Sequence, residues 1–142
     1  MSMSNSLENS LLLLLFNATL FANVAVNATS SPITNVHASL HTADPGETGT
    51  QATSEVTYTS YARVAVARTS GGWTVSTNTV VPVANIDFPL GSGGSGTATF
   101  AGLGNDVSGA GVLWFSGAVT PNIVTGSGVT PRLTTASAVT LD

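Results

Sequence analysis

The sequence contains no cysteine and no lysine, and charged residues of any kind make up only 7% of its 142 residues, where about 25% is usual. Without cysteine, the chain has no disulfide framework and no thiolate zinc site. Its strong cations are three arginines, too few to neutralise the roughly six to ten phosphates that a DNA-binding protein contacts. The composition therefore argues against a disulfide-stabilised fold and against a nucleic-acid partner.

Hydroxyl side chains supply the polarity that charges usually supply, since the chain holds 21 threonines and 17 serines. An apolar fraction of 42% and a mean hydropathy of +0.33 are enough for a core, and they exclude a disordered acidic tail despite the net charge of −4. The length fits one domain. Because the centres of protein interfaces are depleted in charge, this composition favours a protein that assembles with other subunits.

The first 28 residues form an apolar segment that differs from the rest. Leu11–Phe16 is unbroken in its apolar character, and leucines recur at helical spacing around it. Ser4 or Ser6 can act as N-cap, and Glu8 places negative charge in the first turn, where the helix dipole favours it. The pattern predicts a hydrophobic helix over roughly residues 6–21.

This helix is apolar on most sides and therefore needs cover on most sides. We expect one part of it to pack on its own domain and another part against a second chain. The segment is too short for a membrane span and is interrupted by asparagines, and no cation precedes Arg63, as a secretory signal would require. No membrane partner is expected. The candidate interface residues on this segment are Leu11, Leu14, Leu15, Phe16 and Phe21.

From Pro32 onward the sequence is typical of β structure, with short runs rich in valine, threonine and aromatic residues separated by glycine-containing turns. Strands at this spacing predict a single antiparallel β-sandwich, of the jelly-roll kind, over residues 29–142, with residues 1–28 as a helical anchor. The Gly/Ser run at 91–96 predicts a flexible loop or hairpin tip. The expected strands are Ile33–Leu40, Val56–Ala67, Trp73–Val75, Thr79–Val83, Thr97–Phe100, Val112–Val119 and Ala136–Leu141.

Candidate catalytic and metal-binding residues are few. His37 and His41 would share one face of a strand but lie about 13 Å apart, too far for one metal, so we expect solvated or interface histidines. Asp44 and Glu47 flank Pro-Gly, a pattern typical of a turn. A weak calcium site is the less favoured alternative, because it would need further oxygen ligands. No serine stands in a Gly-x-Ser-x-Gly pattern. We therefore expect no enzyme activity, no cofactor and no metal.

The large polar and aromatic side chains are more typical of structure than of chemistry. Arg63 and Arg68 are predicted to be structural or interface anchors, and Arg63 joins the candidate interface residues. Trp73 and Trp114 are predicted to fill the core. Trp73 lies beside two glycines, so stacking on a carbohydrate is kept as an alternative.

From Ile33 to Gly49 the sequence reads ITNVHASLHTADPGETG. Preceded by LENSLLLLLF and followed by EV…SYARVAV, it resembles a family of small tailed-bacteriophage virion proteins. Members commonly end as this chain does, with VLWFSGAVTP, a glycine turn and ASAVTLD. The resemblance spans about residues 5 to 142, and its most specific parts are Leu40–Gly46 and Tyr61-Ala62-Arg63. The chain departs from the pattern at Asn85–Leu103, where GSGGSG replaces an expected longer strand pair.

The resemblance implies a structural role in the virion and synthesis in the host bacterial cytoplasm. Such proteins are often described as tail fibre proteins, and they look like jelly-roll cement proteins of phage heads. Our first hypothesis is a capsid cement or decoration protein, a homo-oligomer (dimer or trimer) that binds the major capsid protein on the capsid surface. The second is a tail fibre or adaptor component. The third is a carbohydrate-binding module for host glycans that uses Trp73 with Tyr58 or Tyr61.

Overall fold

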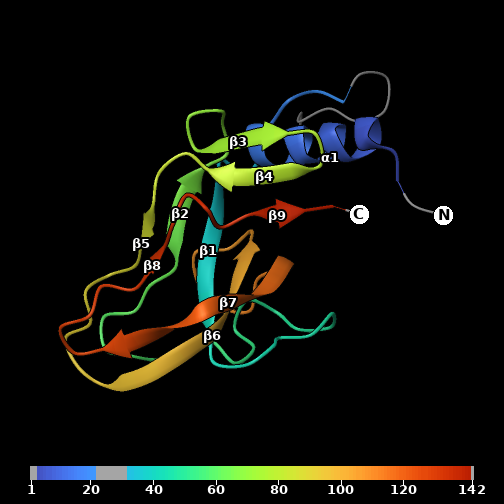
Figure 1. Ribbon diagram of the computed structural model, residues 1–142. Helices are drawn as coiled ribbons and strands as arrows, with labels where there is room; N and C mark the ends of the chain where they lie inside the picture. Colours follow the sequence, from blue (N-terminus) through green and yellow to red (C-terminus); the bar gives the residue numbers. More distant parts are fainter. Residues whose placement is uncertain (1–2, 22–31, 142) are drawn as a thin grey trace. The chain divides into compact units, whose positions relative to one another are not determined.

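The computed structural model describes residues 3–21 and 32–141, in which one helix is followed by nine strands (Figure 1). The predicted fold class, a mainly β antiparallel chain of the sandwich kind with one N-terminal helix, is confirmed. The expected domain boundary at residue 28 lies outside the described residues. The elements are α1 (Asn5–Asn17), β1 (Asn35–His41), β2 (Val64–Ala67), β3 (Trp73–Ser76), β4 (Thr79–Pro82), β5 (Ile86–Asp87), β6 (Ser95–Gly104), β7 (Leu113–Gly126), β8 (Arg132–Leu133) and β9 (Val139–Thr140).

The described strands form three sheets, with strand orders β2-β1-β6-β7, β3-β4-β9 and β5-β8. The chain divides into two compact units. The first comprises Met1–Asn35, Ala67–Asn85 and Thr134–Asp142, and the second Val36–Val66 and Ile86–Leu133. The structure thus groups the helix with β3, β4 and β9 in the first unit, whereas the sequence predicts a separate helical anchor.

In the first unit, α1 lies along β3 and β4 (Figure 1). Leu12 and Phe16, four residues apart on one face of the helix, have no exposed surface. The Phe16 ring meets the Trp73 ring edge-on, with 4.8 Å between their centroids, a geometry that aromatic pairs favour. Trp73 therefore fills the core, as predicted, at 2% exposure.

Both ends of α1 have a side-chain cause. Ser4, one of the two predicted candidates, is the N-cap, and its side chain accepts a hydrogen bond from the Leu7 backbone amide. The helix ends at Asn17, four residues before the predicted end, because Ala18 adopts a left-handed conformation with φ of 52°. Arg68 donates to the Leu14 and Leu15 carbonyls at 2.7 and 2.5 Å, which satisfies acceptors that a helix end leaves open. Arg68 is therefore a structural anchor.

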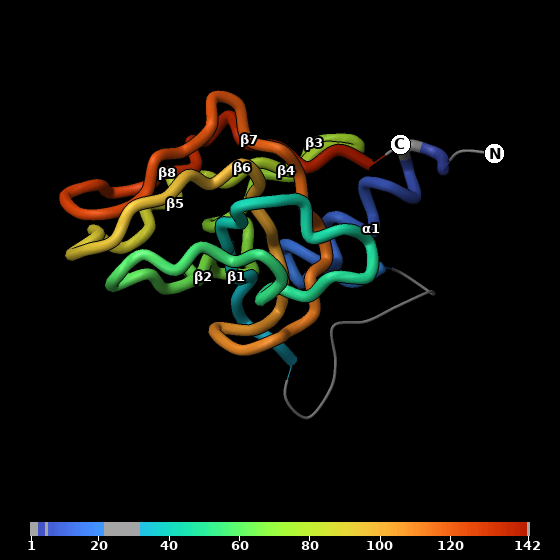
Figure 2. The backbone as a smooth tube through the Cα atoms, turned by 90° about the horizontal axis from the view of Figure 1, so that it is seen from below, coloured from blue at the N-terminus to red at the C-terminus, as the bar shows by residue number. Residues whose placement is uncertain are grey.

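In the second unit, β6 and β7 form a long hairpin, and β6 also pairs with β1 on its other side. Their connection is the orange loop in Figure 2. Strands β6 and β7 both extend beyond their predicted ends. Two further short strands, β5 and β8, were not predicted from the sequence; they pair with each other and lie side by side (Figures 1 and 2). Two-residue strands carry too little periodicity to be recognised in a sequence.

The Gly/Ser run at 91–96 is paired backbone, and the prediction of a loop or hairpin tip there was wrong. Gly93 bridges Thr59, and Ser95 pairs with Gly126 as the first residue of β6. A Cβ atom at Gly91 would overlap the Gly126 carbonyl. The glycines are therefore needed for the close approach of two backbones, a use of glycine that composition alone does not separate from flexibility.

Three aromatic rings pack together in the second unit, with Tyr61 between the other two. Its ring packs edge-on against Tyr58 at 5.4 Å and stacks on Phe88 at 6.2 Å between centroids. Tyr58 and Phe88 are buried. Trp114 is only half-buried, so its predicted place in the core is wrong. It lies on β7, the outermost strand of its sheet, which can be covered from fewer sides.

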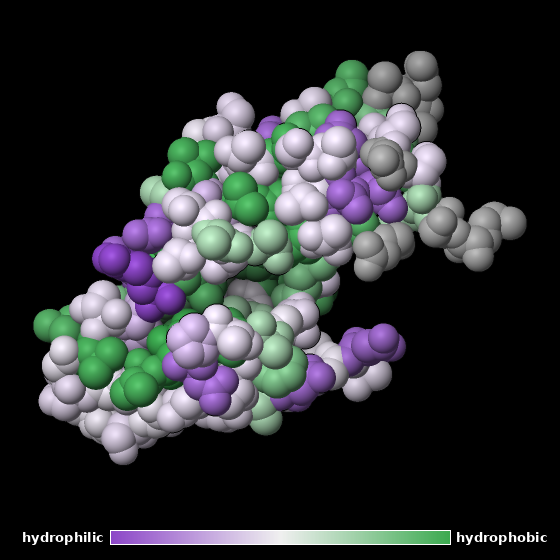
Figure 3. Space-filling view, viewed as in Figure 1, coloured by the Kyte–Doolittle hydropathy of each residue, from purple (hydrophilic) through white to green (hydrophobic). Residues whose placement is uncertain are grey.

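The surface reflects the composition. In Figure 3, pale residues of intermediate hydropathy cover most of the face shown, and strongly hydrophilic residues are confined to small patches. Hydroxyl-rich strands, and not charges, make this surface polar. The large apolar side chains that are exposed on the described residues are Leu7, Leu20, Ile33, Val83, Leu90, Val107, Val112 and Val124.

Candidate functional site

The six predicted interface residues fall into two groups. Phe16 and Arg63 are buried inside their units, so Phe16 reaches a second chain only if α1 leaves its sheet. The others are half-buried, and their interface role stays a prediction; they are Leu11, Leu14, Leu15 and Phe21.

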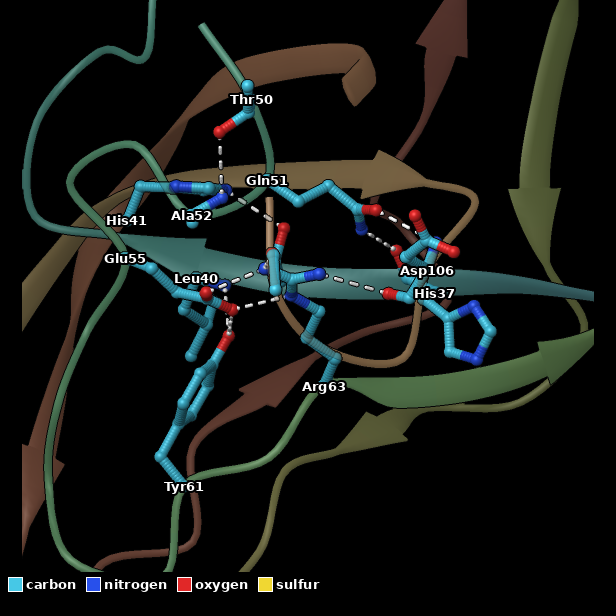
Figure 4. A network of polar contacts seen from close by, with 12 residues as sticks. His37, Leu40, His41, Thr50, Gln51, Ala52, Glu55, Tyr61, Arg63 and Asp106 are labelled. Atoms are coloured by element: carbon cyan, nitrogen blue, oxygen red, sulfur yellow. Dashed lines mark hydrogen bonds and ion pairs between the residues drawn. The ribbon is translucent and has the colours of Figure 1, made fainter. Parts of the chain in front are cut away.

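Arg63 is the centre of a buried polar network in the second unit (Figure 4). Its Nε and Nη2 atoms donate to the two carboxylate oxygens of Glu55 at 2.7 and 2.8 Å. Nη1 donates to the Asp106 carbonyl at 3.1 Å, and Nη2 also donates to the Gly109 carbonyl at 2.6 Å. The hydrogen bonds to Glu55 are the main cause that raises the pKa of Arg63. The guanidinium is therefore a structural anchor that ties the β6–β7 loop to the Glu55 segment.

Tyr61 connects the same carboxylate to β1. Its hydroxyl donates to Glu55 Oε1 at 2.8 Å and accepts from the Leu40 amide at 3.1 Å. Burial raises the pKa of the Tyr61 phenol, which stays protonated and remains a donor at ordinary pH. Leu40–Gly46 and Tyr61-Ala62-Arg63, the stretches that carry the family resemblance, thus meet at this network through Leu40, Tyr61 and Arg63.

Gln51 holds the β6–β7 loop from its other side. Its amide nitrogen donates to the His37 carbonyl at 3.3 Å, and its Oε1 accepts from the Asp106 amide at 2.9 Å. A Cβ atom at Gly111 would come within 2.5 Å of that Oε1 atom. The loop is therefore fixed by buried side chains, although Val107 at its tip is 64% exposed.

His41 and Ser39 form a second buried pair on β1. His41 Nδ1 donates to the Thr53 carbonyl at 2.8 Å, so its Nε2 accepts from the Ser39 hydroxyl at 2.8 Å. Both residues have no exposed surface, and the prediction of a solvated or interface histidine was wrong for His41. The i, i+2 spacing on a strand was the available signal for the pair.

This serine–histidine pair has no room for a substrate. A Cβ atom at Gly102 would lie 2.7 Å from His41 Nε2 and 2.8 Å from the Ser39 hydroxyl, so the neighbouring strand closes over both groups. Burial is the largest cause that lowers the pKa of His41 below 6.5. The pair therefore packs a neutral imidazole between β1 and β6.

The burial of His41 predicts a pH dependence of stability. Below pH 6.5 the unfolded chain takes up a proton that the folded chain does not, so the free energy of unfolding falls as the pH drops through this window. The slope is at most about 1.4 kcal/mol per pH unit for one proton. Urea unfolding at pH 5 to 8 measures it, and His41→Gln should flatten the profile. An unchanged slope in that variant would contradict the assignment.

The remaining candidate sites are structural. Asp44 Oδ1 accepts from the Gly46 amide at 2.9 Å, and Gly46 has φ of 69°, which confirms the predicted turn. Within residues 3–21 and 32–141, no group of three or more His, Asp or Glu side chains is placed to hold a metal ion. Trp73 and Tyr58 are buried and Tyr61 is half-buried, so the rings proposed for carbohydrate stacking are largely covered in the structure.

These features describe a small antiparallel β protein whose best-defined polar groups hold strands and a loop in place. The family described as podophage GP4 fiber I protein gp80 matches residues 2–141. The chain belongs to this family of bacteriophage virion proteins, which confirms the resemblance. No curated protein matches the sequence. In the part of the chain that the structure describes, no helix is long and apolar enough to cross a membrane.

Proposed function

We propose that the protein is a non-enzymatic structural subunit of the phage tail fibre. The observation that carries the proposal is the family match, which runs over nearly the whole chain and names a fibre protein. It reverses the order of our first two hypotheses, because nothing in the family description points to the capsid surface. The buried network supports a mechanical role, since its polar groups serve internal packing.

The mechanism is the presentation of a rigid surface to neighbouring subunits. Buried hydrogen-bond networks rigidify the segments that they join, and here the network fixes the β6–β7 loop between Gln51 and Arg63. A surface with few charges loses little hydration energy when it is covered. Partners are therefore further copies of this chain and other virion subunits, with neither nucleic acid nor membrane among them.

Position and copy number in the particle test the proposal. Reconstruction of purified virions by electron microscopy, with gel densitometry against the major capsid protein, should place the chain on the tail at a low copy number. A copy number comparable with that of the major capsid protein would instead establish the cement role. Binding to a glycan array that is lost in Trp73→Ala, while the fold is retained, would favour the carbohydrate-binding alternative.

A further inference from the structure

Of the large apolar side chains that the structure describes, the four most exposed lie in two pairs at opposite ends of the β6–β7 hairpin. Val107 and Val112 are in the connecting loop, whereas Leu90 and Val124 are near the open end, and their exposed fractions run from 57% to 64%. Since β6 has ten residues, the two ends are roughly 30 Å apart along the strand. Single exposed apolar residues are ordinary, but gathered ones mark interaction sites. Each end of the hairpin is therefore a candidate contact surface.

The loop end joins its two valines to one carboxylate. The Asn105 side-chain oxygen accepts from the Val112 amide at 2.6 Å, and the Asn105 amide donates to the Val112 carbonyl at 3.2 Å, so the ends of the loop meet beside Asp106. The Asp106 side chain is exposed, and the two ion pairs of the described residues leave it unpaired. The buried network already holds this loop, and a preorganised surface loses little freedom on binding. Asp106, Val107 and Val112 are hereafter the loop patch.

Leu90 and Val124 lie close together at the open end, where two backbones meet. A Cβ atom at Gly91 would overlap the Gly126 carbonyl oxygen. Leu90 is the residue before Gly91, and Val124 precedes Gly126 by two positions. Figure 3 shows strongly hydrophobic residues gathered at this end of the second unit, at the lower left of the view.

One cation stands beside this pair. Arg132 on β8 donates through Nε and Nη2 to Asp87, which is three residues from Leu90. Among the described residues its Nη1 group meets no acceptor, and the side chain is 51% exposed. Because Arg63 and Arg68 are buried, Arg132 is the one arginine on the surface. The strand-end patch is hereafter Leu90, Val124 and Arg132.

We propose that the loop patch of one copy binds the strand-end patch of the next copy, so that the chains join head to tail. Each patch offers two aliphatic side chains and one charge, and the two charges have opposite signs. The unpaired Asp106 carboxylate of one copy would meet the Nη1 group of Arg132 in the next. Two loop patches facing each other would instead oppose two carboxylates, and like charges across an interface are costly.

The occupant is a second copy because both halves of this match stand on one hairpin, at different ends of it. Asp44 and Glu47 are also exposed and unpaired. They lie in the turn 42–50, which contains no valine, leucine or isoleucine, and so lack the apolar half of the match. A contact between unlike patches leaves one free patch at each end of the pair, so it repeats along a filament or closes into a ring.

Head-to-tail joining deepens the self-association part of the proposed function and rests on it. It does not depend on where the protein sits in the virion. A chain that stays monomeric in solution but is found on the tail would overturn head-to-tail joining alone. A chain that joins head to tail but is found on the capsid would overturn the fibre proposal alone.

Sedimentation equilibrium of the full chain with Val107→Asp or Leu90→Asp tests the proposal. We expect the wild type to form multiples of 14.2 kDa as its concentration rises. Each variant alone should stay at the monomer mass, with a dissociation constant raised at least about tenfold, because the new carboxylate crowds Asp106 in the loop patch or opposes it from the strand-end patch. Mixed in equal amounts, the two variants should reach twice 14.2 kDa and grow no further, since each keeps one intact patch.

Val83→Asp is the matched control, because it adds the same charge at an apolar residue of the first unit that is 48% exposed. It should assemble like the wild type. Circular dichroism and the melting temperature check that all three variants keep the fold, as their exposed positions predict. A monomeric wild type, equal loss of assembly in Val83→Asp, or a mixture that stays monomeric would overturn the proposal. A dimer formed by either patch variant alone would show that like patches pair, which contradicts head-to-tail joining.

Discussion

Arg63→Ala is expected to lower the free energy of unfolding by about 3–5 kcal/mol, the usual cost of removing one partner of a buried ion pair. The side chains of Arg63 and Glu55 are 2% and 17% exposed, so the substitution leaves a largely buried carboxylate without its guanidinium. It also leaves the Asp106 and Gly109 carbonyls without their donor. Urea unfolding measures the change, and hydrogen exchange should show faster exchange in the 105–111 loop.

Arg132→Ala is the matched control for this prediction. Arg132 also contacts both oxygens of a carboxylate, that of Asp87, but the two side chains are 51% and 46% exposed. Exposed ion pairs contribute little because water solvates and screens both partners. The stability of this variant should stay close to that of the wild type. Equal losses in the two variants would show that Arg63 is not a buried anchor.

Phe16→Ala is expected to destabilise the first unit by about 3–5 kcal/mol, the range for emptying a buried aromatic site. The substitution removes the ring that packs edge-on against Trp73 and leaves a cavity between α1 and β3. Trp73 should become more exposed to water. A red shift of its fluorescence, measured in a Trp114→Phe background, follows this change together with thermal unfolding.

Leu7→Ala is the control on the same helix, since Leu7 is 37% exposed where Phe16 is fully buried. Its loss of stability should be a minor fraction of the loss in Phe16→Ala. A near-neutral Phe16→Ala variant with unchanged fluorescence would contradict the packing of α1 on its own unit. That result would mean that Phe16 is available to contact a second chain.

The strands were largely predictable because their signals are local. Alternating valine and threonine between glycine-rich turns marked β1, β3 and β4 within a few residues. The strand predicted over Val56–Ala67 was wrong in its first part, because β2 comprises only Val64–Ala67. The pairing of the Gly/Ser run was not predictable, because glycine reads the same in a sequence whether it gives flexibility or a close approach. The role of Gly91 in this run depends on the close approach of the Gly126 backbone, and Gly126 lies 35 residues further along the chain.

The polar network shows the same limit. Arg63 was recognised as an anchor because it is one of only three strong cations, but its partner could not be named. Glu55, Gln51 and His41 carried no motif, and hydrogen bonds to backbone carbonyls leave no trace in residue types. The interface composition was readable from the sequence, whereas the surface that forms the interface was not.

By itself, the sequence determined the class of this protein: a single hydrophobic helix, short antiparallel strands, and a hydroxyl-rich surface poor in charge. These properties follow from composition and from periodicities that span a few residues. The tertiary structure alone decided which groups became buried, including Glu8, which the sequence places at a helix start and the fold turns inward to 3% exposure. It also decided which strand stayed at an edge. Burial and edges depend on contacts between distant segments, and no local pattern encodes them.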